Sequence, residues 1–227
     1  MATPLEQRIV ETIRERGAMP FHLFVELALY DETHGFYATS GRAGGRSGDF
    51  ITSVEVGPLF AAVLGDWLDR QWVTCGSPAE FNVSEAGAGI GTLFRGIHRA
   101  APACFDALTY TLVERSAELR SQHESLPGDR WRSAATLPEP RQHVVFANEL
   151  LDNLAFDIAE RVPAGWALVT VGLDDDGALA MSAGEPDPSV AFLSELAANA
   201  PMGCRVPVTT AAAEWVETAR SLSLIHI

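Results

Sequence analysis

The residues best suited to bind a nucleotide-like ligand lie between 83 and 92, where an acidic residue precedes three alternating glycines. The segment reads Val83-Ser84-Glu85-Ala86-Gly87-Ala88-Gly89-Ile90-Gly91-Thr92. Because glycine has no Cβ atom, such a loop can turn sharply and let a ligand lie against bare backbone. The start of a following helix offers free N–H groups to an anion. The segment therefore predicts a cofactor loop between a strand and a helix.

The spacing of the glycines favours one of two cofactor classes. A dinucleotide loop of the form GxGxxG needs glycine at the position that Thr92 occupies. Here the third glycine, Gly91, comes one residue earlier. The form GxGxG after a strand-terminal acid matches the S-adenosylmethionine motif of class I methyltransferases. We therefore expect Glu85 and the three glycines to form part of an S-adenosylmethionine site.

A second acidic residue, Glu114, ends the next expected strand, at residues 109–114. A carboxylate at that strand end can accept hydrogen bonds from both hydroxyls of a ribose. The alternative is a solvated residue with no ligand. Because Glu114 follows the glycine loop by one strand, the two features together favour a nucleoside-cofactor site.

The segment after a later expected strand, 143–147, carries Asn148, Glu149 and Asp152. Ligands of an open parallel sheet sit outside the carboxyl ends of its strands. A buried carboxylate at Glu149 could hold the amine or guanidinium that accepts a methyl group, or take a proton from it. Asn148 could instead be a turn residue and Asp152 a helix cap. We expect Glu149 to be catalytic, with Asp152 and Asn148 as further candidates.

Apolar spacing predicts the elements that position these residues. Helices are expected from Leu5 to Gly17, over 20–30 and over 56–72, the last with its apolar side chains Leu59, Phe60, Val63, Leu64, Trp67 and Leu68 facing inward. The glycine-rich stretch 31–49 is expected to be a surface loop. Strands and helices then alternate, with strands at 81–85, 109–114, 143–147, 166–173, 178–182 and 204–208, and helices at 91–99, 116–126 and 211–222.

Strand–helix–strand alternation predicts a parallel sheet with right-handed crossovers. The expected fold is therefore α/β, with an N-terminal helical region at 1–76 and a Rossmann-like domain at 77–227. A hairpin insertion is expected at 164–182, where an Asp-rich turn separates two apolar segments.

Composition excludes several classes of function. The 227 residues carry a net charge of −14 and include no lysine, which rules out P-loop, Schiff-base and kinase sites. The acidic balance argues against a nucleic-acid partner. Widely spaced cysteines and the absence of an HExxH motif give no reason to expect a metal. No apolar run reaches the ~20 residues of a membrane span, and no basic leader opens the sequence, so we expect a cytoplasmic protein.

Several sequence blocks follow one another in a distinctive order. They are Met19–Tyr30, His34–Tyr37, Gly48–Ser53, Glu55–Phe60, Glu85–Thr92 and Ala147–Asn153. In this order they resemble the MidA-like class I methyltransferases, a family that includes the mitochondrial arginine methyltransferase assisting assembly of respiratory complex I. The second-last block is common to many methyltransferases. The third and the last are not, so the resemblance is specific.

The resemblance implies a Rossmann-like methyltransferase domain with the N-terminal helices and the loop before residue 50 as a lid over S-adenosylmethionine. By this analogy the residues that contact the cofactor or line its pocket are Gly87, Gly89, Gly91, Glu114, Asp49, Thr52 and Ser53. Members of the family continue well past this length. We therefore expect the chain to be C-terminally truncated and to lack later strands of the sheet.

The predicted function is S-adenosylmethionine-dependent methylation of an arginine nitrogen on a protein, by resemblance a substrate of the respiratory complex I type. Two alternatives remain. One is a non-catalytic assembly factor that retains a vestigial cofactor pocket. The other is an NAD-dependent oxidoreductase, against which Thr92 and the lack of lysine count. The sequence does not determine the acceptor protein or the oligomeric state.

Overall fold

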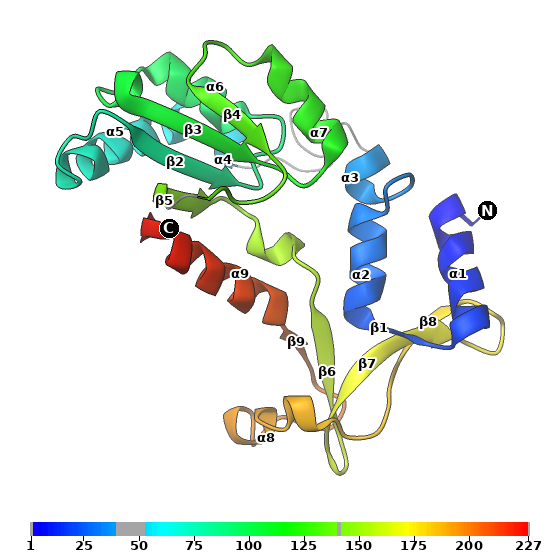
Figure 1. Ribbon diagram of the computed structural model, residues 1–227. Coiled ribbons are helices and arrows are strands. Elements are labelled where there is room, and N and C mark those ends of the chain that lie inside the picture. Colours follow the sequence, from blue (N-terminus) through cyan, green and yellow to red (C-terminus); the bar gives the residue numbers. More distant parts are fainter. Residues whose placement is uncertain (1, 40–52, 140–141, 227) are drawn as a thin grey trace. The chain divides into compact units, whose positions relative to one another are not determined.

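The computed structural model describes residues 2–39, 53–139 and 142–226 (Figure 1). The chain divides into two compact units. We call one the antiparallel unit, which comprises Met1–Phe36 and Asp152–Glu214, and the other the parallel unit, which comprises Tyr37–Leu151 and Trp215–Ile227.

The parallel unit contains a five-stranded sheet in the order β10-β5-β2-β3-β4, and every neighbouring pair is parallel. Its strands are β2 (Phe81–Ala86), β3 (Leu108–Val113), β4 (Trp131–Ala134), β5 (Gln142–Ala147) and β10 (Ser223–His226). The accompanying helices are α3 (Phe36–Thr39), α4 (Ser53–Val56), α5 (Pro58–Thr74), α6 (Thr92–Ala100), η1 (Phe105–Ala107), α7 (Ala117–Ser121) and η2 (Gln122–Ser125). The Rossmann-like α/β fold is confirmed.

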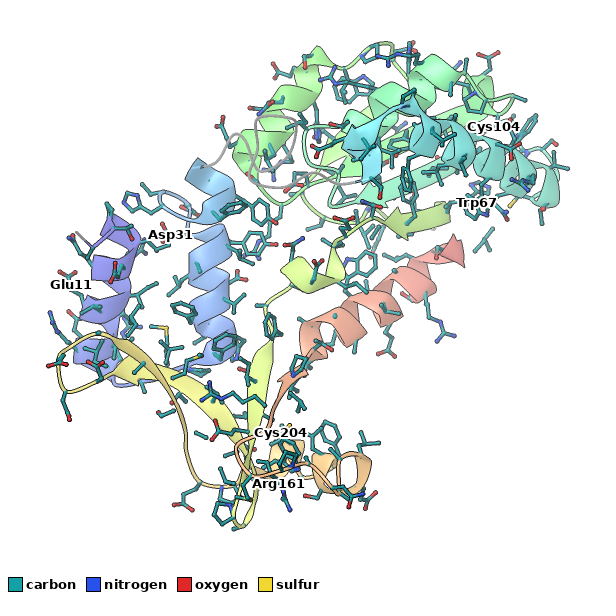
Figure 2. The ribbon with its side chains drawn as sticks, turned by 180° about the vertical axis from the view of Figure 1, so that it is seen from behind. Glu11, Asp31, Trp67, Cys104, Arg161 and Cys204 are labelled. Carbon is teal, nitrogen blue, oxygen red and sulfur yellow. The ribbon has the colours of Figure 1, made fainter. Side chains whose placement is uncertain are left out.

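The core of this unit lies where α5 and α6 pack beside the sheet. Phe81, Leu108 and Tyr110 are completely buried. Strands covered on both faces need such nearly continuous apolar runs. Cys104 is buried in the same cluster and Trp67 packs against it (Figure 2).

Several details of the parallel unit differ from expectation. Strand β10 and the short helix α3, which lies within the expected loop 31–49, were not predicted. Leu59 and Val63 of α5 are 74% and 57% exposed, so the prediction that they face inward was wrong. Phe60, Leu64 and Leu68 do contribute to the core, because a spacing of four keeps them on one helical face while the two exposed residues lie on another. The short strand β4 was not predicted, since four residues at a sheet edge carry almost no periodic signal.

The antiparallel unit has the strand order β1-β7-β6-β9, with β8 also paired to β7. Its strands are β1 (Met19–Pro20), β6 (Asp157–Val162), β7 (Gly165–Leu173), β8 (Leu179–Ala183) and β9 (Arg205–Val208). The helices are α1 (Pro4–Arg16), α2 (Phe21–Tyr30), η3 (Leu151–Asn153), η4 (Pro188–Val190), α8 (Leu193–Leu196) and α9 (Thr210–Leu222). Helices α3, η3 and α9 cross the boundary between the units along the chain.

Two small apolar clusters hold the antiparallel unit together. Ile9 and Ile13 of α1 pack with Met19 and Val171, joining the N-terminal helix to β7. Trp166 packs with Val190 and others in the second cluster. The guanidinium carbon of Arg161, labelled in Figure 2, lies 5.9 Å from the centre of the Trp166 ring.

The division into units differs from the boundary expected after residue 76. Residues 1–36 form one unit with 152–214 because β1 pairs with β7, across a long sequence separation. Helix α5 belongs instead with the parallel sheet, against α6. The expected hairpin is present as β7 and β8, but it belongs to the antiparallel unit. Within the ranges that the structure describes, no helix has both the length and the apolarity needed to cross a bilayer.

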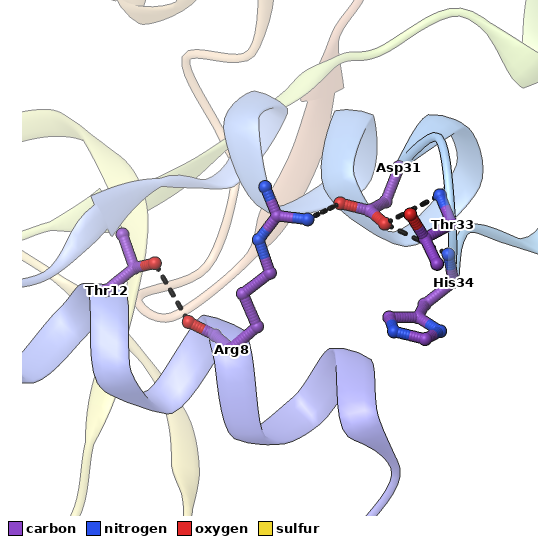
Figure 3. Close-up of polar contacts among 5 residues, drawn as sticks. All are labelled: Arg8, Thr12, Asp31, Thr33 and His34. Carbon is purple, nitrogen blue, oxygen red and sulfur yellow. Dashed lines mark hydrogen bonds and ion pairs between the residues drawn. The ribbon is translucent and has the colours of Figure 1, made fainter.

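Asp31, just after α2, ties α1 to the following turn (Figure 3). One carboxylate oxygen accepts hydrogen bonds from the backbone N–H groups of Thr33 and His34, at 3.1 and 2.9 Å. The other forms an ion pair with Arg8 of α1. Burial by itself would raise the pKa of Asp31, but these N–H groups and the Arg8 charge outweigh it and lower the pKa.

A second buried acid, Glu85, lies at the end of β2. Its side chain is in the core of the parallel unit, where the Tyr110 hydroxyl donates a hydrogen bond of 2.7 Å to Oε2. Burial raises the pKa of Glu85 to about 8, although the bond from Tyr110 opposes the shift. A carboxyl group with this pKa is largely protonated at neutral pH.

We expect Asp31→Asn to lower the free energy of unfolding at pH 7 by about 1–3 kcal/mol, because a buried charge-assisted network is broken. The folded-state pKa is lowered, so this stabilisation is present above pH 3.8 and is lost as the pH falls through the folded pKa. Urea denaturation at pH 7 and pH 3 tests both points. Asp66→Asn, which breaks an exposed pair with Arg70, is the control and should change stability little. Equal effects of the two substitutions at pH 7 would contradict the role of Asp31.

We expect Glu85→Gln to flatten the pH dependence of stability. A raised folded-state pKa means that the folded chain binds more protons than the unfolded chain between pH 4.5 and about 8, so stability falls as the pH rises through this window. The variant should therefore gain at least about 1 kcal/mol relative to wild type between pH 5 and pH 8.5, measured by urea denaturation. Glu80→Gln, at an exposed position before β2, should show no such gain. Parallel pH profiles for wild type and Glu85→Gln would refute the buried-acid assignment.

Candidate functional site

Three strand ends of the parallel unit meet at the predicted site. Ala86, the last residue of β2, pairs with Val113 of β3 on one side and with Ala147 of β5 on the other. The residues that follow these strands are the glycine loop, Glu114 and Asn148, respectively. Open parallel sheets bind ligands outside such carboxyl ends. The register thus brings together segments that are distant in the sequence.

The glycine loop adopts a conformation that side chains would oppose. All three glycines have positive φ, with values of 71°, 55° and 80° at Gly87, Gly89 and Gly91. A Cβ atom at Gly91 would lie 2.9 Å from side-chain atoms of Leu112 and Leu126, so a larger residue here would have to displace these leucines and adopt positive φ as well. A Cβ atom at Gly89 would meet nothing within 4 Å. Gly89 therefore leaves backbone accessible at the point where the chain turns into α6.

Glu114 is bonded directly to this loop. Its Oε2 accepts a hydrogen bond of 3.0 Å from the Gly89 N–H, and its Oε1 accepts one of 2.8 Å from the Ser116 N–H. The residue is 8% exposed, and burial raises the pKa of Glu114 against the opposing effect of these N–H groups. The two features from which the sequence predicted a cofactor site are thus in contact.

Two polar residues near Glu114 were not anticipated. The Arg120 guanidinium donates hydrogen bonds to the carbonyl oxygens of Glu114 and Arg115, at 2.8 and 2.6 Å, and so fixes the turn that follows β3. The Ser116 hydroxyl donates to the Tyr37 carbonyl oxygen at 3.1 Å. Serine before a short helix predicts a cap, but nothing in the local sequence indicates that it also contacts Tyr37.

Of the segments expected to form a lid, the structure describes Tyr37 in contact with the site, through its hydrogen bond from Ser116. Tyr37 ends the block His34–Tyr37, and its carbonyl is held two residues from Glu114. Ser53 is exposed at the start of α4. Asp49 and Thr52, also expected to line the pocket, lie outside the described residues.

The side chain of Glu85, which was expected to bind the cofactor, is buried in the core of the parallel unit. The residue is 4% exposed, and its carboxyl group accepts a hydrogen bond from Tyr110 in the core. A direct contact with the cofactor stays a prediction. The contact in the structure is one that supports the end of β2.

The segment after β5 turns sharply at Glu149. This residue has φ of 52°, an unusual value for a residue with a side chain. The next residue, Leu150, packs toward the loop, since its Cδ1 lies 3.1 Å from where a Cβ of Gly87 would be. Glu149 is exposed, so the expectation of a buried carboxylate was wrong. The turn directs the side chain of Leu150, and not that of Glu149, toward the glycine loop.

The other two candidates of this segment are also accessible. Asn148 is half-buried directly after β5. Asp152 is exposed in η3 and is the first residue of the segment that belongs to the antiparallel unit. Catalytic roles for Asn148, Glu149 and Asp152 stay predictions.

Comparison with known proteins identifies the family. The sequence model described as "Putative S-adenosyl-L-methionine-dependent methyltransferase" matches residues 63–223. The mouse mitochondrial protein arginine methyltransferase NDUFAF7 is 26% identical in an alignment 203 residues long, which covers 76% of this chain and 46% of that protein. Its zebrafish counterpart is 30% identical over 201 residues, with the same shares. The chain thus spans about half the length of the curated relatives it matches.

Solved structures agree with this relationship. A Burkholderia thailandensis protein crystallised with S-adenosyl-homocysteine is 29% identical and superposes with a TM-score of 0.85, over 99% of this chain and 62% of that one. The native structure of a protein from the same organism gives a TM-score of 0.82 at 29% identity, over 99% of this chain and 61% of that one. The family match covers well over half of this chain, and the fold and the glycine loop agree with it. The chain therefore belongs to the methyltransferase family that uses S-adenosyl-L-methionine, as the MidA-like resemblance predicted.

Proposed function

We propose that this chain is a methyltransferase that transfers the methyl group of S-adenosylmethionine to a nitrogen on a protein, most specifically to an arginine. The observation that carries the proposal is the hydrogen bond between the Gly89 N–H and Glu114 Oε2 at the carboxyl ends of β2 and β3. It joins the glycine loop to the acid that suits a ribose. Family membership supports the same class of cofactor.

The residues of this site fit the cofactor. The bare backbone at Gly89 gives a ligand room to approach, and the N-terminus of α6 follows immediately. Oε2 of Glu114 accepts the Gly89 N–H and Oε1 accepts the Ser116 N–H, and because a carboxylate has about four acceptor positions it can also accept from a ribose hydroxyl. When bound, the cofactor supplies an electrophilic methyl group on a sulfonium. The chain then has to orient the acceptor and exclude water.

The acceptor is proposed from chemistry and from the relatives. Glu149 and Asn148 follow β5 beside the loop, where a carboxylate can hold a guanidinium or receive a proton from it. Curated relatives are named protein arginine methyltransferases, which supports a protein arginine as the substrate. The MidA-like resemblance adds a subunit of respiratory complex I as the substrate to test first.

Replacing Glu114 with alanine should weaken binding of S-adenosyl-homocysteine by about 1–3 kcal/mol, because ribose hydroxyls would lose their acceptor. Isothermal titration calorimetry measures this, with NAD as the ligand that should not bind. Glu118→Ala is the matched control, since Glu118 is exposed on neighbouring α7. If Glu114→Ala bound as tightly as wild type, the ribose assignment would fail. Saturable binding of NAD alone would favour the oxidoreductase alternative.

Replacing Glu149 with glutamine should leave the affinity for S-adenosyl-homocysteine unchanged but lower turnover by about 10²-fold, the lower range for a group that moves or neutralises a proton. Turnover is measured as transfer of radiolabelled methyl from S-adenosylmethionine to purified subunits of respiratory complex I. Glu149→Asp keeps the negative charge, and aspartate tolerates the positive φ of this position. This variant should therefore retain more activity than the glutamine variant. Full activity of Glu149→Gln would remove this residue from the mechanism.

A further inference from the structure

His123 is buried in the parallel unit and contacts the glycine loop. It lies in η2, is 1% exposed, and uses both ring nitrogens. Nε2 lies 2.8 Å from the Gly89 carbonyl oxygen, and Nδ1 lies 2.7 Å from the Ser133 hydroxyl on β4. The ring therefore links the edge of the sheet to the loop.

These partners determine which ring nitrogen carries the proton. A carbonyl oxygen only accepts hydrogen bonds, so Nε2 must be protonated and donate to Gly89. Nδ1 of the neutral ring then accepts a hydrogen bond from the Ser133 hydroxyl. Burial lowers the pKa of His123, the hydrogen bond to the Gly89 carbonyl opposes this shift, and the positive charges of Arg120 and Arg95 add to it; the net lowering favours the neutral form.

Hydrogen bonds, not packing, hold the Gly89 residue in place. Its N–H donates to Glu114, its carbonyl accepts from His123, and the side where a Cβ would stand is open. Glycine has the widest conformational freedom of any residue, so at Gly89 itself rotation about ψ meets little steric opposition, whereas the β-branched Ile90 restricts rotation about its own φ. The bond from His123 is the hydrogen bond that fixes the direction of the Gly89 carbonyl.

The next amide, Ile90 N–H, belongs to the same peptide plane as the Gly89 carbonyl. The other amides of the loop have partners, since Gly87 and Ala88 donate to the Val113 carbonyl, Gly89 to Glu114, and Gly91 to the Ala88 carbonyl. Across the described part of the chain, Ile90 N–H has no hydrogen-bond acceptor. In a trans peptide the N–H points opposite to the C=O. The N–H of Ile90 is therefore directed away from His123, just before the N-terminus of α6.

We propose that His123 is a positioning residue of the cofactor site, which holds the Gly89–Ile90 peptide so that the Ile90 N–H donates to the carboxylate of S-adenosylmethionine. This role rests on the proposed function. A free N–H before a helix N-terminus suits an anion, and the carboxylate is the only anionic group of this cofactor. His123 touches the loop and not the ligand, so it acts through the orientation of one peptide.

Two substitutions separate this role from simple core packing. In glutamine the amide nitrogen is as many bonds from Cβ as Nε2 is in histidine, so His123→Gln can still donate to Gly89. In asparagine the side chain reaches only the Nδ1 position, so His123→Asn can keep Ser133 but not Gly89. Both variants lose the ring, and a packing role would affect them alike.

The ligands to titrate by calorimetry are S-adenosyl-homocysteine and 5′-methylthioadenosine, which lacks the amino-acid carboxylate. We expect His123→Asn to bind S-adenosyl-homocysteine at least about 10-fold more weakly than wild type, as for a lost charge-assisted hydrogen bond, while its affinity for 5′-methylthioadenosine changes less than about 3-fold. His123→Gln should bind S-adenosyl-homocysteine more tightly than His123→Asn. His143→Asn is the control, because the half-buried His143 accepts a bond from Asn82 N–H at 3.0 Å and does not touch the loop.

Each other outcome overturns the proposal in a recognisable way. Equal weakening for both ligands, or equal loss in both His123 variants, indicates packing alone. Unchanged affinity in His123→Asn removes the role but leaves the proposed function standing. Wild type that binds neither ligand refutes the proposed function and this role with it.

A measurement on the wild-type chain avoids any loss of folding in the variants. Long-range ¹⁵N–¹H NMR of the imidazole rings should find His123 protonated at Nε2 alone, with its resonances shifted by S-adenosyl-homocysteine more than those of His143. A ring protonated at Nδ1 alone could not donate to the Gly89 carbonyl, and that result would overturn the proposal.

Discussion

The in-register pairing of β2 with β3 and β5 is the constraint on which the site depends. It places Ala86 beside Val113 and Ala147, so three chain segments leave the sheet at the same edge. A change of register shifts all residues of a strand together relative to its neighbours. A slip of β2 along β3 would therefore move the glycine loop away from Glu114. The buried apolar side chains of β2 and β3 oppose such a slip, because both strands are buried nearly throughout and a slip would remove each side chain from the neighbours it packs against.

The glycine loop is ordered by polar groups that come from other elements. Its glycines provide the turn and the access, but they supply no side chains that could hold it. Glu114, just after β3, accepts a hydrogen bond from the Gly89 N–H, and His123 of η2 donates one to the Gly89 carbonyl. Arg120 fixes the turn that carries Glu114. Buried polar contacts of this kind fix orientation, because an unpaired partner in the core is costly. A binding loop can therefore be open to a ligand and still hold one conformation.

The sequence predicted most of the elements of the parallel unit and the pairing of the glycine loop with Glu114. These predictions succeed because strand–helix alternation and a loop without Cβ atoms leave local signals. The division into units was not predicted correctly, because β1 is only two residues long and its pairing with β7 has no local signal. The exposure of Leu59 and Val63 was missed for a related reason, since an apolar helix does not by itself reveal which face the protein covers.

By itself the sequence determined the class of fold, the cofactor loop and the family, because each depends on residue types at short fixed spacings. Only the tertiary structure decided that Glu85 is buried against Tyr110, that Glu149 is exposed at a turn with positive φ, and that His123 reaches the Gly89 carbonyl. The physical reason is that burial and hydrogen-bond partners are set by segments far apart in the chain, and one residue type is compatible with many such surroundings.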